Sequence, residues 1–101
     1  MQFEMTVYIL RCVDGSYYVG STKQEIEARV WEHNNLSIDG YTARRRPVVL
    51  VFTESYERIT DALARERQIK GWSRRKKETL IARAYENLPA LSRRGHLIRK
   101  E

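Results

Sequence analysis

Cysteine is almost missing from this sequence, since Cys12 is the only one among 101 residues. A single cysteine excludes an internal disulfide and a zinc site built from several thiolates. No segment approaches the roughly 20 apolar residues that span a bilayer, and the amino terminus lacks the pattern of a signal peptide. We therefore expect a cytoplasmic protein without a membrane partner, in which Cys12 lies in the first strand as a small core residue.

The residues that are present favour one small globular domain with a large excess of positive charge. Apolar residues make up 42% of the chain, and the length of 101 residues suits a single core. There are 19 lysine and arginine residues against 13 aspartate and glutamate residues, so the net charge is +6. This excess indicates a polyanionic partner, with nucleic acid as the leading candidate.

The first third of the chain is predicted to form a β-hairpin and a helix. Two short apolar runs, 7–10 and 17–19, flank Asp14 and Gly15, a pair that is favoured in tight turns. Apolar residues then recur at helical spacing over residues 23–36.

The remainder is predicted to form one strand and two helices. The β-branched run 48–52 is typical of a strand buried on both faces, and we expect it at the centre of the sheet. Thr60 caps a helix that ends at Gly71, and Ser73 caps another that Pro89 closes. Its expected apolar stripe consists of Leu80, Ile81, Ala84, Tyr85 and Leu88.

These elements predict the fold class α/β (α+β), with a three-stranded, mostly antiparallel sheet surrounded by helices. Residues 1–88 would form the single small domain. Residues 89–101 are polar and basic, and are expected to form a C-terminal tail.

Glu66 interrupts an apolar face of the predicted second helix. At helical spacing it falls inside a stripe formed by Ala62, Leu63 and Ile69. Burying even a neutral polar group costs about 2 to 7 kcal/mol, so this position implies a cation, a buried base or an open cleft. A divalent metal would satisfy the carboxylate, and an ion pair with Lys70 is the alternative.

Arg29 and His33 lie one turn apart and border the buried ridge of the first helix. From the pattern alone, a solvated face with a Glu25–Arg29 ion pair is the favoured interpretation, and phosphate binding with proton transfer is the functional alternative. Likewise, Tyr8 and Tyr18 could be ordinary strand tyrosines.

Clustered cations are the candidates for binding nucleic acid. Four of them occupy the first turn of the predicted third helix, where the helix dipole disfavours cations by up to about 1 kcal/mol each. An external phosphate would reverse that penalty, whereas a solvated surface is the alternative. The candidate binding residues are Arg44, Arg45, Arg46, Lys70, Arg74, Arg75, Lys76 and Lys77.

Taken in order, these residues resemble the GIY-YIG endonuclease superfamily. The tripeptides TVY at 6–8 and YVG at 18–20 stand at the two tripeptides of its name, with Thr6 in place of the first glycine, and Arg29, His33 and Glu66 follow in the family's order. The segments YTARRRPVVLVF and ALARERQIKGWSRRKKETLI look like those of the small stand-alone bacterial members, the UPF0213-like proteins.

The resemblance implies an endonuclease that uses one Mg²⁺ or Mn²⁺ ion and cleaves DNA by direct attack of water, with Glu66 as the metal ligand. Tyr8 would be the base once a nearby cation lowers its pKa, and His33 would relay the proton. Arg29 would stabilise transition-state charge and Tyr18 would position water or phosphate.

Gly20 is expected to have a structural role, because it allows close backbone approach. No region is long enough for a separate target-selecting domain, so specificity would come from DNA shape or from a recruiting protein.

Two other functions stay open. A nucleic-acid binder that no longer cuts is favoured by Thr6, which stands at the first glycine of the motif, and by residues 76–79, where many members carry an asparagine. A basic adaptor that docks on a ribosome or an acidic protein is the third hypothesis.

Overall fold

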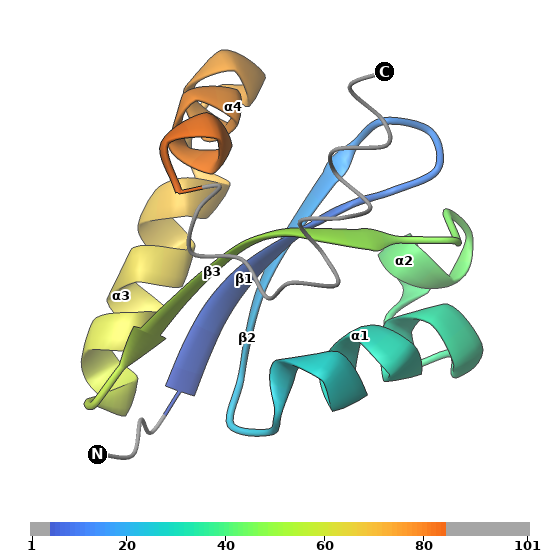
Figure 1. Ribbon diagram of the computed structural model, residues 1–101, viewed down its shortest axis with the longest axis horizontal. Coiled ribbons are helices and arrows are strands. Elements are labelled where there is room, and N and C mark those ends of the chain that lie inside the picture. The colour runs from blue at the N-terminus through green and yellow to red at the C-terminus, as the bar shows by residue number, and fades with distance from the viewer. Residues whose placement is uncertain (1–4, 85–101) are drawn as a thin grey trace.

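A three-stranded antiparallel sheet forms the middle layer of the fold (Figure 1). The computed structural model describes residues 5–84. The strands are β1 (Met5–Arg11), β2 (Tyr17–Thr22) and β3 (Val49–Tyr56), in the order β2-β1-β3. This confirms the predicted fold class. The predicted centre of the sheet was wrong, because β1 rather than the strand after residue 48 lies in the middle.

The predicted β-hairpin joins β1 to β2. Gly15 has a φ of +86°, a backbone conformation that glycine adopts without steric cost, and the Asp14 carboxylate accepts the Ser16 backbone N–H at 3.0 Å. Cys12 follows β1 instead of lying in it. It is buried, as expected for a small core residue.

Strand β3 is buried on both faces although it lies at an edge. Its register against β1 shifts, so that Leu50 faces Leu10 and Phe52 faces Ile9, which leaves Val51 as an extra residue. Val51 and Phe52 both join one apolar cluster, whereas Leu50 joins the other. Continuous burial here comes from helices on both faces and from the bulge, not from a central position.

Within residues 5–84, four helices surround the sheet: α1 (Ile26–Asn35), α2 (Gly40–Ala43), α3 (Ile59–Lys70) and α4 (Arg74–Arg83). The Ser73 side chain caps α4 as predicted, accepting the Lys76 N–H at 3.1 Å. Helix α3 begins one residue before Thr60, with Arg58 at the cap position and no side-chain cap, so the predicted cap was wrong. Asp39 caps α2, a short helix within the predicted polar loop.

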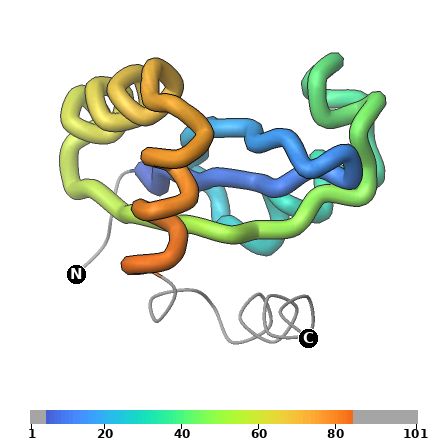
Figure 2. Tube along the Cα trace, turned by 90° about the horizontal axis from the view of Figure 1, so that it is seen from above, coloured from blue at the N-terminus to red at the C-terminus, as the bar shows by residue number. Residues whose placement is uncertain are grey.

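The helices divide into two groups on opposite faces of the sheet. Ala62 and Ile69 of α3 pack on Val7 and Ile9, whereas α1 covers the face that carries Tyr8. Figure 2 shows α3 above the strands and α1 below them. The apolar stripe of α3 is narrower than predicted, since 41% of Leu63 is exposed.

Several predictions lie outside the described residues. They concern the apolar positions Tyr85 and Leu88, the helix stop at Pro89, the boundary after residue 88 and the tail at 89–101. Within residues 5–84, no helix has the length and apolar character needed to cross a bilayer.

Candidate active site

A chain of hydrogen bonds joins the first tyrosine of the motif to α1 and α2. The Tyr8 phenol oxygen lies 2.8 Å from His33 Nε2, and His33 Nδ1 lies 2.8 Å from Thr42 Oγ1. All three side chains are buried. Two of the predicted site residues, Tyr8 and His33, are therefore in contact, and the solvated-face interpretation of His33 was wrong.

Arg29 approaches the same phenol from the side. Its Nε donates to the Tyr8 oxygen at 3.4 Å, and its Nη1 forms an ion pair with Glu32 at 3.1 Å. The ion partner is thus Glu32 rather than Glu25. The Arg29 side chain is 28% exposed, so its guanidinium can meet both the phenol and a ligand arriving from solvent.

Tyr18 lies beside this group and has its own acceptor. Its hydroxyl donates to Asp39 Oδ2 at 3.1 Å. The ring centroids of Tyr18 and His33 are 5.1 Å apart, and those of Tyr18 and Tyr8 are 6.4 Å apart. Both predicted tyrosines therefore belong to one aromatic cluster.

Glu66 is held from two sides on α3. Ser21 of β2 donates to one carboxylate oxygen at 2.5 Å, and Lys70 forms an ion pair with the other at 2.7 Å. The side chain of Glu66 is only 16% exposed, whereas that of Lys70 is 54% exposed. The Lys70 ion pair, which was the alternative to a metal at this position, is present, and Ser21 is a further partner that the pattern did not indicate.

The two halves of the site lie on opposite faces of the sheet and meet at β2. Successive side chains of a strand point to opposite faces, so Gly20 faces Tyr8 while Ser21 faces Glu66. A Cβ atom on Gly20 would lie 2.7 Å from the Tyr8 hydroxyl oxygen. Gly20 thus leaves the space that the phenol occupies, which supports a structural role.

Burial governs the acidity of the tyrosines. It raises the pKa of Tyr8, and the hydrogen bond and positive charge of Arg29 offset this only in part. Burial also raises the pKa of Tyr18, and the negative charge of Asp39 adds to the effect. The expected cation beside Tyr8 is present, but the net shift of the Tyr8 pKa is upward.

The pKa values of His33 and Asp39 are both lowered. A lower pKa keeps His33 neutral, so that it can accept a proton, and keeps Asp39 negatively charged. Burial, reinforced by the charge of Arg29, lowers the pKa of His33, so the imidazole is neutral at neutral pH. Burial opposes ionisation of Asp39, yet hydrogen bonds from the Tyr41 N–H and the Tyr18 hydroxyl hold its pKa below the usual value.

The Glu66 carboxylate could be a ligand for a metal ion that keeps most of its water ligands. Residues 5–84 contain no cluster of three or more His, Cys, Asp or Glu side chains that could hold an ion. A single carboxylate is compatible with Mg²⁺, which often binds proteins through one or two carboxylates together with waters and phosphate oxygens. The Lys70 ammonium contacts this carboxylate and would have to move aside for an ion.

Two small hollows border this site, one beside Tyr18 and one beside Glu66. One, of about 250 Å³, includes Tyr18, Asp39, Lys70 and Lys77 in its lining. Another, of about 220 Å³, is lined by Leu63, Glu66, Arg67 and Lys70. Lys70 therefore borders the space on both the tyrosine side and the glutamate side.

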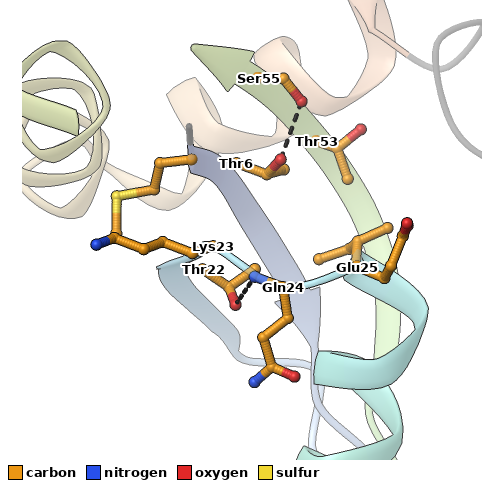
Figure 3. A pocket seen from close by; sticks show the side chains of 9 residues that line it. Thr6, Thr22, Lys23, Gln24, Glu25, Thr53 and Ser55 are labelled. Carbon is orange, nitrogen blue, oxygen red and sulfur yellow. Dashed lines mark hydrogen bonds between the residues drawn. The ribbon is translucent and has the colours of Figure 1, made fainter. Parts of the chain in front are cut away.

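A larger polar hollow of about 490 Å³ lies beyond the site, near the start of α1. Thr6, Thr22, Thr53 and Ser55 contribute hydroxyl groups to it (Figure 3). Thr6 Oγ1 lies 3.0 Å from Ser55 Oγ, so the residue that replaces the family's glycine forms a contact with β3. None of the five predicted catalytic residues lines this hollow.

The predicted nucleic-acid-binding cations fall into three groups. Lys70 and Lys77 lie at the hollow beside Tyr18. Arg45 and Arg74 instead hold the β1–β2 turn, because Arg45 pairs with Asp14 and Arg74 donates to the Gly15 carbonyl. The other candidates are Arg44, Arg46, Arg75 and Lys76, all of which are exposed.

Three residues of the site were not predicted from the sequence: Ser21, Asp39 and Thr42. Ser21 directly follows Gly20, the last residue of the YVG tripeptide, so its side chain points to the opposite face of the strand. This alternation was the one signal in the sequence that could have placed Ser21 beside Glu66. Asp39 contacts Tyr18 and Thr42 contacts His33 because α2 packs on α1, which no local pattern indicates.

Comparison with known proteins defines first the class of protein. Residues 4–79 match the model of the GIY-YIG catalytic domain, and the two tyrosines, Arg29, His33 and Glu66 all fall within this range.

Similar proteins then narrow the class. A UPF0213 protein of Staphylococcus saprophyticus is 47% identical over 76 residues, which cover 75% of this chain and 92% of the relative. A UPF0213 protein of Staphylococcus aureus is 49% identical over 75 residues, covering 74% and 90%. The solution NMR structure of a UPF0213 protein from Bacillus halodurans is 38% identical, with a TM-score of 0.51 and coverage of 77% and 82%. The chain therefore belongs to the GIY-YIG family, in its UPF0213 group.

Proposed function

We propose that this protein is a divalent-metal-dependent endonuclease that hydrolyses DNA phosphodiester bonds by direct attack of water. One observation carries the proposal. Tyr8, Arg29 and His33 are joined by hydrogen bonds on one face of β2, and Glu66 stands beside the same strand on the other face. A proton acceptor, a phosphate-binding cation and a hard oxygen ligand thus surround one edge strand.

Tyr8 and His33 form the proposed route for the proton. The Tyr8 proton passes to Nε2 of His33 over 2.8 Å, and the resulting phenolate takes a proton from the attacking water. The new P–O bond forms as the bond to the 3′ oxygen breaks. Solvent protonates that oxygen and His33 returns its proton to solvent, so the products carry 5′-phosphate and 3′-hydroxyl ends and the neutral side chains are restored. The lowered pKa of His33 provides the neutral imidazole that the first transfer needs.

Access of water to Tyr8 requires a local opening. Tyr8 has no exposed surface, and Arg29 donates to its phenol oxygen. Movement of the partly exposed Arg29 side chain toward a bound phosphate would uncover the phenol and place positive charge on the phosphate at once. Tyr18, held by Asp39, would position the phosphate or the water.

Glu66 would hold the metal ion, with Ser21 fixing one of its oxygens. When bound, the ion supplies Lewis-acid stabilisation of negative charge on the phosphate. Lys70, released from the carboxylate, would join Lys77 in contacting the DNA backbone beside Tyr18. Such contacts hold the strand without reading its sequence, so a recruiting protein or DNA shape would select the target.

The second candidate is a nucleic-acid binder that does not cut. It is favoured by the Glu66–Lys70 ion pair, which already neutralises the carboxylate, and by the complete burial of Tyr8. The same cations would then produce salt-sensitive binding without a metal-dependent product.

Cleavage of labelled single-stranded, duplex and branched DNA with Mg²⁺ or Mn²⁺ tests the two candidates. The informative variants are Glu66→Gln and Arg29→Ala. The ion pair Arg65–Glu54, at 2.9 Å, supplies matched controls, because both side chains are partly exposed and lie outside the site. Arg65→Ala and Glu54→Gln should therefore retain cleavage.

Loss of cleavage in Glu66→Gln and Arg29→Ala, with binding retained and both controls active, is the expected result. Metal-independent cleavage, or equal activity in all four variants, would identify a contaminating nuclease and contradict the proposal. Tight, salt-sensitive binding without any product would favour the binder.

A further inference from the structure

Thr42 is a buried polar residue whose position the motif of the family does not explain. It lies in α2, and its hydroxyl oxygen is 2.8 Å from His33 Nδ1. The Thr42 side chain also approaches the backbone carbonyl of Asp39 at 3.4 Å. A carbonyl oxygen only accepts hydrogen bonds. The Thr42 hydroxyl can therefore donate its proton to Asp39 and still accept a hydrogen bond from His33.

The partners of Tyr8 determine the direction of the hydrogen bonds that join Tyr8, His33 and Thr42. Among the described residues, the Tyr8 oxygen has two partners, His33 Nε2 and Arg29 Nε. Arginine only donates, so the Tyr8 proton must go to Nε2, which must then be unprotonated. A neutral imidazole with a bare Nε2 carries its proton on Nδ1 and donates it to Thr42 Oγ1.

The opposite direction leaves a polar group unsatisfied. If Thr42 donated to Nδ1, then Nε2–H would point at the Tyr8 oxygen and the phenol proton would lack an acceptor within the described residues. Tyr8 has no exposed surface that would let water take that role. An unsatisfied buried donor is costly, so the first arrangement is favoured.

We infer that Thr42 is a positioning residue that holds His33 in the Nδ1–H tautomer and thereby keeps Nε2 free to accept the proton of Tyr8. The inference rests on the proposed function, in which His33 takes this proton. Thr42 does not touch the substrate. It acts only through the orientation and tautomer of the imidazole, as the acceptor partner of a catalytic histidine does.

Nitrogen NMR of the imidazole tests the tautomer directly, since the chain has only two histidines and His96→Gln identifies the signals of His33. The wild-type protein should show a protonated Nδ1 and a bare Nε2. Thr42→Val removes the hydroxyl while keeping the shape, and should populate the other tautomer. Thr42→Ser should restore the wild-type signals.

Thr22→Val is the matched control, because Thr22 is also buried but its hydroxyl pairs with the Gln24 N–H. It measures what loss of a buried threonine hydroxyl does to folding alone, and it should leave the His33 signals unchanged. Partners that fix a histidine tautomer typically contribute about 10- to 100-fold to activity, so kcat of Thr42→Val should fall by that factor. Thr42→Ser and Thr22→Val should cleave at rates close to the wild-type rate.

The outcomes separate this inference from the proposed function. An unchanged tautomer in Thr42→Val would overturn the inference, even if cleavage fell. A changed tautomer with unchanged cleavage would overturn the role of His33 in proton transfer. If the wild-type protein does not cleave DNA, the proposed function fails, and the NMR spectra alone decide whether Thr42 sets the tautomer.

Discussion

The two faces of the sheet differ in what their side chains do. On the α3 face, Val7 and Ile9 pack against Ala62 and Ile69 in a continuous apolar cluster. On the α1 face, the strand residue between them, Tyr8, is equally buried but ends in a hydrogen-bonded chain. One strand therefore supplies stability to one side and buried polar chemistry to the other.

The polar face is tolerated because its groups are paired. Within residues 5–84, no buried side-chain nitrogen or oxygen lacks a hydrogen-bond partner. Paired polar groups add little net stability compared with apolar packing, but they fix the orientation of each member. The side chains of β1 that stabilise the fold thus lie on one face of the sheet, and the buried polar residue of β1 lies on the other. The polar α1 face and Glu66 come together at β2.

The largest expected effect is on the polar face. Tyr8→Phe removes the proposed base, so we expect cleavage to fall by about 10²- to 10⁴-fold. The free energy of unfolding should fall by only about 1 to 3 kcal/mol, the cost of leaving His33 without its donor. Single-turnover kinetics and urea unfolding measure the two effects. Tyr17→Phe, on the other face of β2, is the control, and equal activity of both variants would remove Tyr8 from the mechanism.

The apolar face should show the reverse. Ile69→Ala opens a cavity against Val7 and Ile9, and such truncations lower the free energy of unfolding by about 2 to 5 kcal/mol. Cleavage per folded molecule, measured well below the unfolding transition, should stay at the wild-type level. A large loss of activity in this variant while it is fully folded would break the division between the faces.

Ser21→Ala tests the part of the site that lies on the α3 face. Ser21 orients one oxygen of Glu66, so its loss should weaken Mn²⁺ binding by about 10- to 100-fold. Calorimetric titration of Mn²⁺ measures this independently of DNA cleavage. Ser55→Ala, which removes a serine hydroxyl from β3, is the control. Unchanged Mn²⁺ affinity in Ser21→Ala would show that Glu66 does not need this partner.

The smallest expected effect is a pH dependence of stability. The pKa of His33 is lower in the folded protein than its usual value of 6.5, so the unfolded chain binds the proton more readily. Stability should therefore be complete above about pH 6.5 and decrease as the pH falls below it. The charge of Arg29 reinforces this shift, whereas Asp39 and Glu32 oppose it.

Urea unfolding between about pH 8 and pH 5 measures this dependence, and His33→Gln should flatten it over that range. Asp39 cannot imitate the effect, because its pKa lies below the usual value of 3.8 and it titrates at lower pH. Stability that rises as the pH falls through 6.5 would contradict a buried neutral His33.

Two local signals in the sequence predicted local structure correctly, whereas a third, the Thr60 cap, was wrong. The hairpin at Asp14 and Gly15 and the Ser73 cap are present, because each depends on a few neighbouring residues. The central position of the run 48–52 was wrong, because two-sided burial does not distinguish a central strand from a covered edge strand with a bulge.

Those site residues could be predicted whose chemical type is unusual for their position or whose order along the chain resembles the family. Glu66 on an apolar face and the ordered set of tyrosine, arginine and histidine were found from the sequence and the family resemblance. The contacts of His33 with Thr42 and of Tyr18 with Asp39 depend on how α2 packs on α1, and no spacing along the chain encodes that.

The central claim is that Tyr8 and Glu66, which lie on opposite faces of the sheet, form one catalytic centre across β2. Single-turnover cleavage by Tyr8→Phe, Glu66→Gln and the double variant, at saturating Mn²⁺, tests it most directly. Residues that act as a unit are strongly non-additive, so the double variant should be about as slow as the slower single variant. Losses that simply multiply, with binding retained, would contradict a shared centre.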